Sequence, residues 1–222
     1  MASRLGLVAL ALFFATPASA TGTALGVDPA ASIETAVATR TLVVGDDIAI
    51  GDRIVTDAAG VVQVKFDDGT LLVIGPRSAL VIEDFLQRAD DSAGRFVIEA
   101  LSGTFRFVTG TAAKDRYEIS LPTGMIGVRG TAFDFHVDVD ATSILACEGE
   151  VLMCADGEAC KPLRANCGVG QIDAASARRL GPESQNRDSR TFRVRFPFAI
   201  GQGGLLPAFR LDMPRTACSL KD

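Results

Sequence analysis

The sequence predicts an all-β protein, built as a twisted β-solenoid or rolled sheet of many short strands. From Leu42 to Val151, apolar and polar residues alternate in short runs, and Gly, Asp or Pro residues separate one run from the next. Helical periodicity is weak in the same region. Hydrophobic residues make up 48% and charged residues 22% of the 222-residue chain, which is typical of a folded protein. The repeated short steps between Asp-Gly turns favour a coil that winds stepwise.

The strands can be assigned in order along the chain. Alternation predicts strands at 61–66 and 70–74, on either side of a turn at 67–69, and further strands at 80–82, 96–100, 105–107 and 117–121. The clearest strand is 133–139, whose apolar face is formed by Phe133, Phe135, Val137 and Val139. We expect its other face to be solvated, with weak cation binding as the alternative. That face carries Asp134, His136, Asp138 and Asp140. Short helices are possible at 33–37 and 174–180.

Residues 1–20 have the three zones of a secretory signal peptide. Arg4 supplies the positive start, and an apolar run from Leu5 to Ala15 follows, shorter than the roughly 20 residues that span a bilayer. Small residues at 18–20 predict cleavage after Ala20. We therefore expect a periplasmic or secreted protein, with an uncleaved anchor helix as the alternative.

The cysteines fit an oxidising compartment. The first four have spacings C-x6-C-x5-C-x6-C, wider than the gaps between zinc ligands, so we expect structural disulfides rather than a metal. The spacing is symmetric about Gly157, which favours a hairpin with Cys154 opposite Cys160 and Cys147 opposite Cys167. Other connectivities remain open, because Cys218 can replace any partner and one thiol stays free or pairs between chains. The candidates are Cys147, Cys154, Cys160, Cys167 and Cys218.

Charge divides the chain after the leader into two parts. Residues 21–175 carry 12 basic and 23 acidic side chains, whereas residues 176–222 carry 9 basic and 4 acidic ones. The second part is rich in arginine, and it either folds back on the acidic part or forms a linker or an arm. We expect a signal peptide at 1–20, an N-terminal extension at 21–41, a β domain at 42–153, a Cys-rich hairpin that completes it at 154–175, and an Arg-rich C-terminal segment at 176–222.

Several segments, taken in order, resemble the FecR domain family. Residues 51–56 (GDRIVT) are similar to its opening step, 62–70 (VQVKFDDGT) to its strand, Asp-Gly-Thr turn and strand, and 74–80 (IGPRSAL) to the next step. Residues 101–105 (LSGTF), 121–133 (LPTGMIGVRGTAF) and 147–151 (CEGEV) resemble its later elements, with Leu-Pro-Thr where Thr-Pro is more usual. The signature residues that carry the resemblance are Asp68, Gly69, Thr70, Pro76, Ser78, Pro122, Val128, Arg129, Gly130, Thr131, Phe133, Glu148 and Gly149.

The resemblance implies an extracytoplasmic domain, which relatives build as a twisted β-solenoid. FecR in the strict sense is a membrane-spanning regulator of a sigma factor that links an outer-membrane iron transporter to transcription. We expect no transmembrane segment after signal cleavage, so we do not carry that relay over. Within 128–131 (VRGT) we expect the residues to fix a corner of the coil, with Arg129 paired to Asp134 or Glu148. Contact with a ligand is the alternative.

Composition excludes most classes of enzyme. The chain has one His, one Tyr and no Trp, so no mechanism or metal site that needs two imidazoles is possible. It has no Gly-x-Ser-x-Gly turn, phosphate loop or Rossmann glycine pattern. We expect no catalytic residue, no cofactor, no metal and no nucleic-acid partner. Our interpretation is a non-enzymatic module that binds an envelope protein in signalling or assembly, through a sheet edge or face. The alternative is a protein that binds envelope glycan or anchors at the surface.

Overall fold

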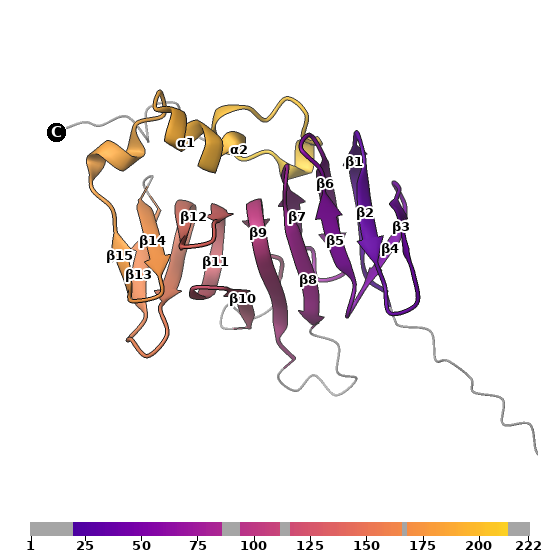
Figure 1. The fold of residues 1–222 in the computed structure, drawn as a ribbon, viewed down its shortest axis with the longest axis horizontal. Helices are drawn as coiled ribbons and strands as arrows, with labels where there is room; N and C mark the ends of the chain where they lie inside the picture. The colour runs from indigo at the N-terminus through magenta and orange to yellow at the C-terminus, as the bar shows by residue number, and fades with distance from the viewer. Residues whose placement is uncertain (1–19, 86–93, 112–115, 166–167, 213–222) are drawn as a thin grey trace, which may run out of the picture.

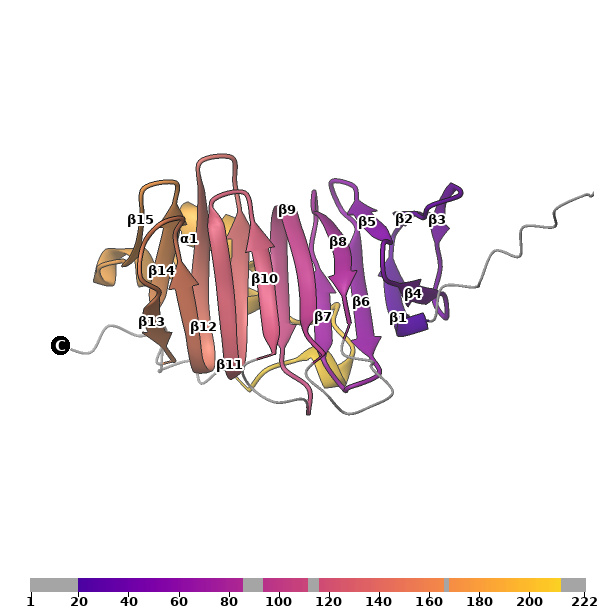
Figure 2. The same ribbon diagram turned by 90° about the horizontal axis from the view of Figure 1, so that it is seen from below.

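The computed structural model describes residues 20–85, 94–111, 116–165 and 168–212. This part of the chain is predominantly β, and its strands lie side by side along the long axis of the molecule (Figure 2). All its strands join in one large sheet that does not close. The strands are β1 (Ala20–Asp28), β2 (Ala31–Glu34), β3 (Thr39–Leu42), β4 (Asp47–Ala49), β5 (Arg53–Thr56), β6 (Val61–Phe66), β7 (Leu71–Ile74), β8 (Ala79–Asp84), β9 (Phe96–Val108), β10 (Tyr117–Leu121), β11 (Gly124–Val137), β12 (Ala141–Cys154), β13 (Lys161–Arg164), β14 (Val169–Asp173) and β15 (Ser176–Arg179).

The C-terminal part of the chain forms short helices that lie across the sheet. Figure 1 shows them running from the β15 end of the molecule toward β6 and β7. The α-helices begin after Ser189, whose side chain accepts a hydrogen bond from the Phe192 N–H and so caps α1. The helices are η1 (Pro182–Gln185), α1 (Arg190–Arg195), α2 (Pro197–Ile200) and η2 (Pro207–Phe209).

Backbone pairing arranges the strands in two series that share three long strands. The first series runs β4-β1-β6-β7-β9-β11-β12-β14-β15, and the second runs β3-β2-β5-β8-β9-β10-β11-β12-β13. Residues 96–102 of β9 pair with β8 and β10, whereas residues 103–108 pair with β7 and β11. In β11 and β12, likewise, one half of each strand pairs within the first series and the other half pairs within the second. The sheet therefore folds over on itself.

The apolar core lies between the two series. Phe96 and Phe107 stand eleven residues apart on β9, a separation of about 36 Å along a straight strand. Their ring centroids are nevertheless only 5.7 Å apart. Phe66 of β6 also meets Phe96 edge-to-face, with centroids 4.8 Å apart. The bent strands thus bring two apolar faces together, and one continuous core fills the space between them.

Glycines in the left-handed conformation stand at the bends. Gly103 in β9 has a φ of +101°, and a Cβ there would lie 2.4 Å from the Ser78 Cα. Gly149 in β12 has a φ of +67°, and a Cβ there would lie 2.4 Å from the Gly130 carbonyl oxygen. Any side chain at these two positions would strain the backbone and collide with a neighbouring strand. The bends therefore require glycine.

Three segments differ from the sequence expectations. Residues 33–37 are not helical, because Ile33 and Glu34 complete β2 and the chain then turns into β3. Residues 174–180 form a turn and β15 instead of a helix. In both places pairing with a neighbouring strand satisfies the backbone, which outweighs a weak helical pattern. Residues 21–41, expected as an extension, supply most of β1, β2 and β3; β1 pairs with β6, β2 with β5, and β3 with β2.

We expect Gly149→Ala to lower the free energy of unfolding by about 2–4 kcal/mol, because left-handed strain and a collision with the Gly130 carbonyl add together. Gly157→Ala is the matched control, since Gly157 has a φ of +74° but no atom within 4 Å of the ideal Cβ. Urea unfolding of both variants measures the difference. Equal losses in the two variants would contradict the close approach of strands at this bend.

Candidate functional site

Signature residue Ser78 ties the first bend together. It lies against Gly103, and its Oγ accepts a hydrogen bond from the Thr104 N–H at 2.9 Å. The same hydroxyl lies 3.2 Å from the Pro76 carbonyl oxygen, to which it can donate. Thr56 Oγ1 accepts from the Ser78 N–H at 2.9 Å. These bonds hold β5, β8 and β9 together at one corner of the folded sheet.

The Asp68-Gly69-Thr70 turn between β6 and β7 anchors two other parts of the chain. Asp68 Oδ1 accepts from the Thr70 N–H at 2.9 Å, and Asp68 Oδ2 accepts from the Tyr117 hydroxyl at 2.6 Å. Thr70 Oγ1 accepts from the Gly110 N–H at 3.1 Å. Gly69 closes the turn with a φ of +85°. This turn therefore connects β7 to β10 and to the residues that follow β9.

Thr131 holds the corner where β11 bends beside β12. Its hydroxyl donates to the Glu148 carbonyl oxygen, and its N–H donates to Thr109 Oγ1 at 2.9 Å. Gly130 and Gly149, on the two strands of this corner, both have positive φ. The Glu148 side chain is exposed, so only its backbone takes part. The hydrogen bonds of this corner are consistent with the architectural role expected for the segment.

Three further signature residues have simple packing positions. Val128 and Phe133, on either side of the corner, are buried in the core. Pro122 is exposed in the turn that joins β10 to β11. None of the three brings a polar side chain to the surface.

Arg129 differs from the rest of the signature. Its side chain is exposed, and it forms neither of the expected ion pairs. Asp134 pairs with Arg106 instead, and Glu148 lies exposed beyond the bend. Residue 129 stands opposite Glu150 in the register, but the Glu150 carboxylate pairs with another arginine. The expected burial of Arg129 is therefore wrong, because its side of β11 faces outward in the second series.

A row of buried side chains crosses the outer face of the first series. Each member stands directly opposite the next on the neighbouring strand, and each is at most 4% exposed. The row consists of Gln63, Val73, Arg106, Asp134, Leu145 and Val169. The expected solvated face is therefore wrong at Asp134, although Asp138 and Asp140 are exposed. Asp134 is buried because the C-terminal segment covers it.

An ion pair lies at the centre of the row. Arg106 Nε donates to Asp134 Oδ1 at 2.6 Å and Arg106 Nη2 to Oδ2 at 2.9 Å, and both side chains are fully buried. Arg106 Nη1 donates to Gln202 Oε1 at 2.5 Å, and the guanidinium lies 5.7 Å from the centre of the Phe198 ring. Burial raises the pKa of the Asp134 carboxyl, and the Arg106 charge opposes that shift. The hydrogen bonds between Arg106, Asp134 and Gln202 thus satisfy the polar groups of this closed site.

Aromatic side chains hold the C-terminal segment on this row. Phe192 and Phe196 pack with Leu145 and Val169, while Phe198, Leu205 and Phe209 pack with Val73. Gln63 Oε1 accepts from the Leu206 N–H at 2.7 Å. The described part of the Arg-rich segment therefore folds back on the β domain, which was one of the two expected arrangements, and does not extend as a free arm.

His136, the chain's one histidine, lies beside the buried row on β11. Its Nδ1 is 2.7 Å from Thr104 Oγ1 on β9. Burial lowers the pKa of His136, Asp138 raises it, and Arg195 of α1 lowers it. The net shift of the His136 pKa is downward, which favours the neutral imidazole, and the fully solvated position expected for this half-buried side chain is wrong.

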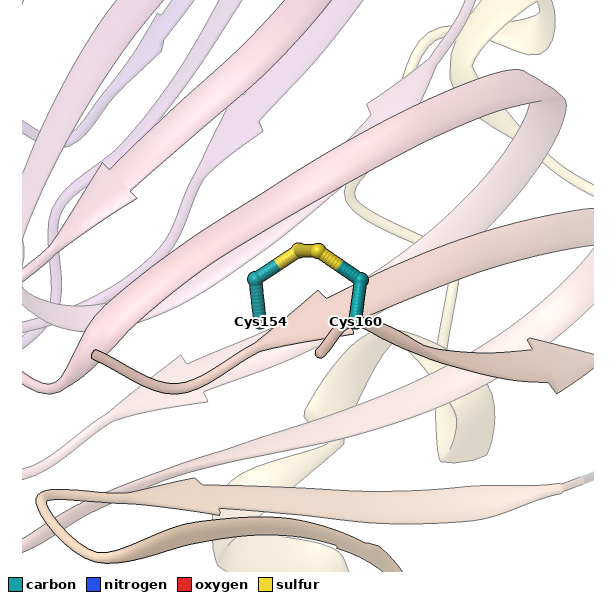
Figure 3. Close-up of a disulfide and its surroundings, with 2 residues drawn as sticks. All are labelled: Cys154 and Cys160. Atoms are coloured by element: carbon teal, nitrogen blue, oxygen red, sulfur yellow. A yellow bond between two sulfur atoms is a disulfide. The ribbon is translucent and has the colours of Figure 1, made fainter. Parts of the chain in front are cut away.

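The cysteine region forms one disulfide. β12 and β13 pair so that Glu150 faces Arg164 across the ladder, and the chain turns at Gly157. Cys154 and Cys160 are bonded at the end of this ladder (Figure 3). Cys147 has a free thiol that packs under α1, and burial raises its pKa. The pairing expected for Cys147 is therefore wrong, because its thiol is free. Cys167 and Cys218 lie outside the described residues.

The two ends of the sheet have different surfaces. At one end lie β3 and β4, each paired on one side only, and most large exposed apolar side chains of the described residues lie beside them. We call this surface the N-terminal edge: β3 and β4 with Leu25, Val37, Val43, Val44 and Ile50. At the opposite end, β13 and β15 carry exposed Lys161, Arg164, Arg178 and Arg179 (Figure 1). Charge of this kind blocks strand addition, whereas the N-terminal edge is open to it.

Two further observations concern the described residues only. There, no group of three or more His, Cys, Asp or Glu side chains could hold a metal ion. No helix in the same part of the chain has the length and apolar character needed to cross a membrane. The predicted leader falls outside the described residues, apart from Ala20, which begins β1.

Residues 52–152 match the family model for the FecR protein. Residues 52–152 therefore form a FecR domain. All the signature residues, from Asp68 to Gly149, lie inside the match. The FecR match starts at β5 and ends within β12, so the N-terminal edge and the C-terminal helices lie outside it.

Two solved structures from Parabacteroides distasonis ATCC 8503, described as a candidate anti-sigma factor, are similar to this FecR-domain chain. Each is 14% identical, with a TM-score of 0.45, and the similarity covers 58% of this chain and 57% of that one. This chain thus spans little more than half the length of those proteins. A comparison with curated proteins gives no match.

Sequence reasoning missed the buried ion pair and the apolar edge. Arg106 lies between two phenylalanines in a strand pattern, which indicated only an outward position. Its partner Gln202 is 96 positions away, so no local pattern connects the two. The run Leu42-Val43-Val44 was a usable signal for the edge, because β-branched residues beside a turn commonly begin or end strands.

We expect Asp134→Ala to lower the free energy of unfolding by about 3–5 kcal/mol, because it leaves the buried Arg106 charge without its carboxylate. Replacing both partners with apolar residues (Arg106→Met with Asp134→Leu) should recover most of that loss. Arg164→Ala breaks an exposed ion pair and should cost at most about 1 kcal/mol. Chemical unfolding compares the three. An Asp134→Ala loss as small as that of Arg164→Ala would refute the buried pair.

We expect stability to fall as the pH drops through 6.5, partly because of His136. Its pKa is lower in the folded state than the ordinary 6.5, so the unfolded chain binds more protons around this pH. The neutral imidazole's contribution is therefore fully present above 6.5 and is lost as the pH falls toward the folded pKa. His136→Gln should flatten the pH dependence of the unfolding free energy. An identical slope in both proteins would rule this out.

Proposed function

We propose that this FecR-domain chain is a non-enzymatic interaction module of the bacterial envelope, and that it binds a protein partner in signalling or assembly through the N-terminal edge. The observation that carries the proposal is the contrast between the two ends of the sheet. One end carries four exposed basic residues, three of them paired with carboxylates, and the other presents strands paired on one side only with exposed apolar side chains beside them.

The N-terminal edge has the two features that strand addition uses. β3 and β4 each have one side without a neighbouring strand among the described residues, which leaves backbone donors and acceptors for an extended segment. Val43 and Val44, 53% and 62% exposed, stand between these strands. Arg40, the one charged residue of β3, pairs with Asp46, and β4 carries one exposed carboxylate, Asp47. An extended, apolar segment of a partner protein fits this edge.

The signature corners support a role without catalysis. The hydrogen bonds of four signature residues lie within turns and bends. These residues are Asp68, Thr70, Ser78 and Thr131. The lone histidine lies beside a threonine hydroxyl, and the downward shift of its pKa favours the neutral form. Through these bonds the family motif serves the architecture that displays the surfaces.

The proposal includes several finer statements. The folded sheet winds as a twisted solenoid. Residues 42–153 form the FecR unit, and residues 154–175 form a Cys-rich hairpin that completes it. Residues 1–20 are a signal peptide cleaved after Ala20, and the mature protein is periplasmic or secreted. The strand halves that alternate between the two series support the winding, and the Cys154–Cys160 disulfide supports an oxidising compartment.

The proposal predicts that Val44→Lys removes partner binding, because a charge on the edge opposes strand addition. The full chain, immobilised and exposed to detergent extract of its native envelope, should capture a protein that Val44→Lys captures at least about tenfold less. Val139→Lys is the matched control, since Val139 is 86% exposed and lies in the β11–β12 turn.

Capture by Val139→Lys should equal that of the unaltered chain. Equal loss in both valine variants would place the contact elsewhere. Recovery of no protein partner, together with retention on purified cell wall, would replace this proposal with glycan binding or surface anchoring.

A further inference from the structure

Three arginines converge on the outer face of the second series. Arg95 immediately precedes β9 and Arg116 immediately precedes β10, and the parallel register of these strands sets the two side by side. Tyr117 stands opposite Val128, so Arg116 and Arg129 are opposite one position further along. Neighbouring strands are about 4.8 Å apart, so the three arginines stand in one row across three strands, and all three line the same hollow. We call them the arginine row.

The arginine row borders a hollow of about 180 Å³. Gly127 and Leu152 contribute to its lining, and Glu118 stands at its side. Gly127 has no positive φ, and a Cβ there would lie 3.4 Å from Leu152, an ordinary contact. Glycine is therefore not required by the backbone at 127, and its missing side chain leaves the hollow open. In Figure 2 the strands β9 to β13 lie in front of the C-terminal helices, on the face that those helices leave uncovered.

The charges of the row are incompletely balanced. Arg95 pairs with Glu118, and Arg116 donates to the Gly94 carbonyl oxygen at 3.2 Å. Among the described residues, Arg129 has no carboxylate partner, because the neighbouring Glu150 pairs with Arg164. Like charges on directly opposed strand positions destabilise a sheet. The arrangement is favourable once an anion lies between them, and it stands out in a β domain that is acidic as a whole.

We propose that the arginine row and its hollow bind an acidic segment of the protein partner, with carboxylates on the guanidinium groups and an apolar side chain against Leu152. Guanidinium binds carboxylate through paired hydrogen bonds, which gives both strength and orientation. A sugar would need an exposed aromatic platform, yet the chain has no Trp, and its one Tyr, which borders the hollow, is only 3% exposed. This inference rests on the proposed function, and it gives Arg129, the exposed charged residue of the VRGT motif, a role that the architecture does not supply.

The test uses a fluorescein-labelled octapeptide of alternating Glu and Leu, with the full chain as receptor and anisotropy as the readout. We expect Arg129→Gln to weaken binding about tenfold or more, and rising salt to weaken it further. Arg164→Gln is the control on the same face, and it should change affinity less than about twofold because its pair with Glu150 is exposed. Gly127→Leu should fill the hollow and abolish binding without lowering the thermal midpoint.

The outcomes separate this inference from the edge proposal. Val44→Lys should bind the acidic peptide normally, and a Gln–Leu peptide should not bind. Equal weakening by Arg129→Gln and Arg164→Gln, no binding by the unaltered chain, or preference for an oligogalacturonate of equal charge would each overturn the acidic-segment assignment. Normal peptide binding by Arg129→Gln, together with loss of the envelope partner by Val44→Lys, would reject the hollow as the binding site for an acidic segment. The same result would leave the N-terminal edge as the partner-binding surface.

Discussion

The bending of β9, β11 and β12 is the constraint on which the rest of the structure depends. Each strand gives one half to each series, and Phe96 and Phe107 meet across the core because β9 turns back between them. Glycines make these bends possible, and the Ser78 hydroxyl fixes the bend in β9 while the Thr131 hydroxyl fixes the corner of β11 and β12. Without these bends the apolar faces would have no partner, and the two outer faces would not exist as separate surfaces.

The two outer faces then take different roles. The first is closed by the C-terminal segment, whose aromatic residues and Gln202 surround the Arg106–Asp134 pair. A buried ion pair of this kind contributes little net stability but fixes which segment docks and where. The second face and the N-terminal edge stay uncovered by described residues. Recognition is therefore proposed where the fold leaves backbone, apolar side chains and arginines accessible.

The sequence predicts the strands better than it predicts their surroundings. Alternation around Phe133 and Phe135 identifies a strand with one apolar face, because side chains on a strand point to opposite sides. It cannot tell what covers the other face, so Asp134 looks solvated although a segment about 60–75 residues further along buries it. The prediction for Arg129 is wrong in the opposite direction. The motif indicated a buried side chain at a corner, whereas its side of β11 faces outward. Residues 21–41 lie before the family match, and only long-range pairing shows that they belong to the sheet.

Site-specific photo-crosslinking in the living cell tests the central claim most directly. A photoreactive residue at position 44, on the N-terminal edge, should crosslink to one envelope protein. The same residue at position 178, on the charged edge formed by β15, should give no such product. Crosslinking from position 178 and not from position 44 would contradict the assignment of the N-terminal edge as the partner-binding surface.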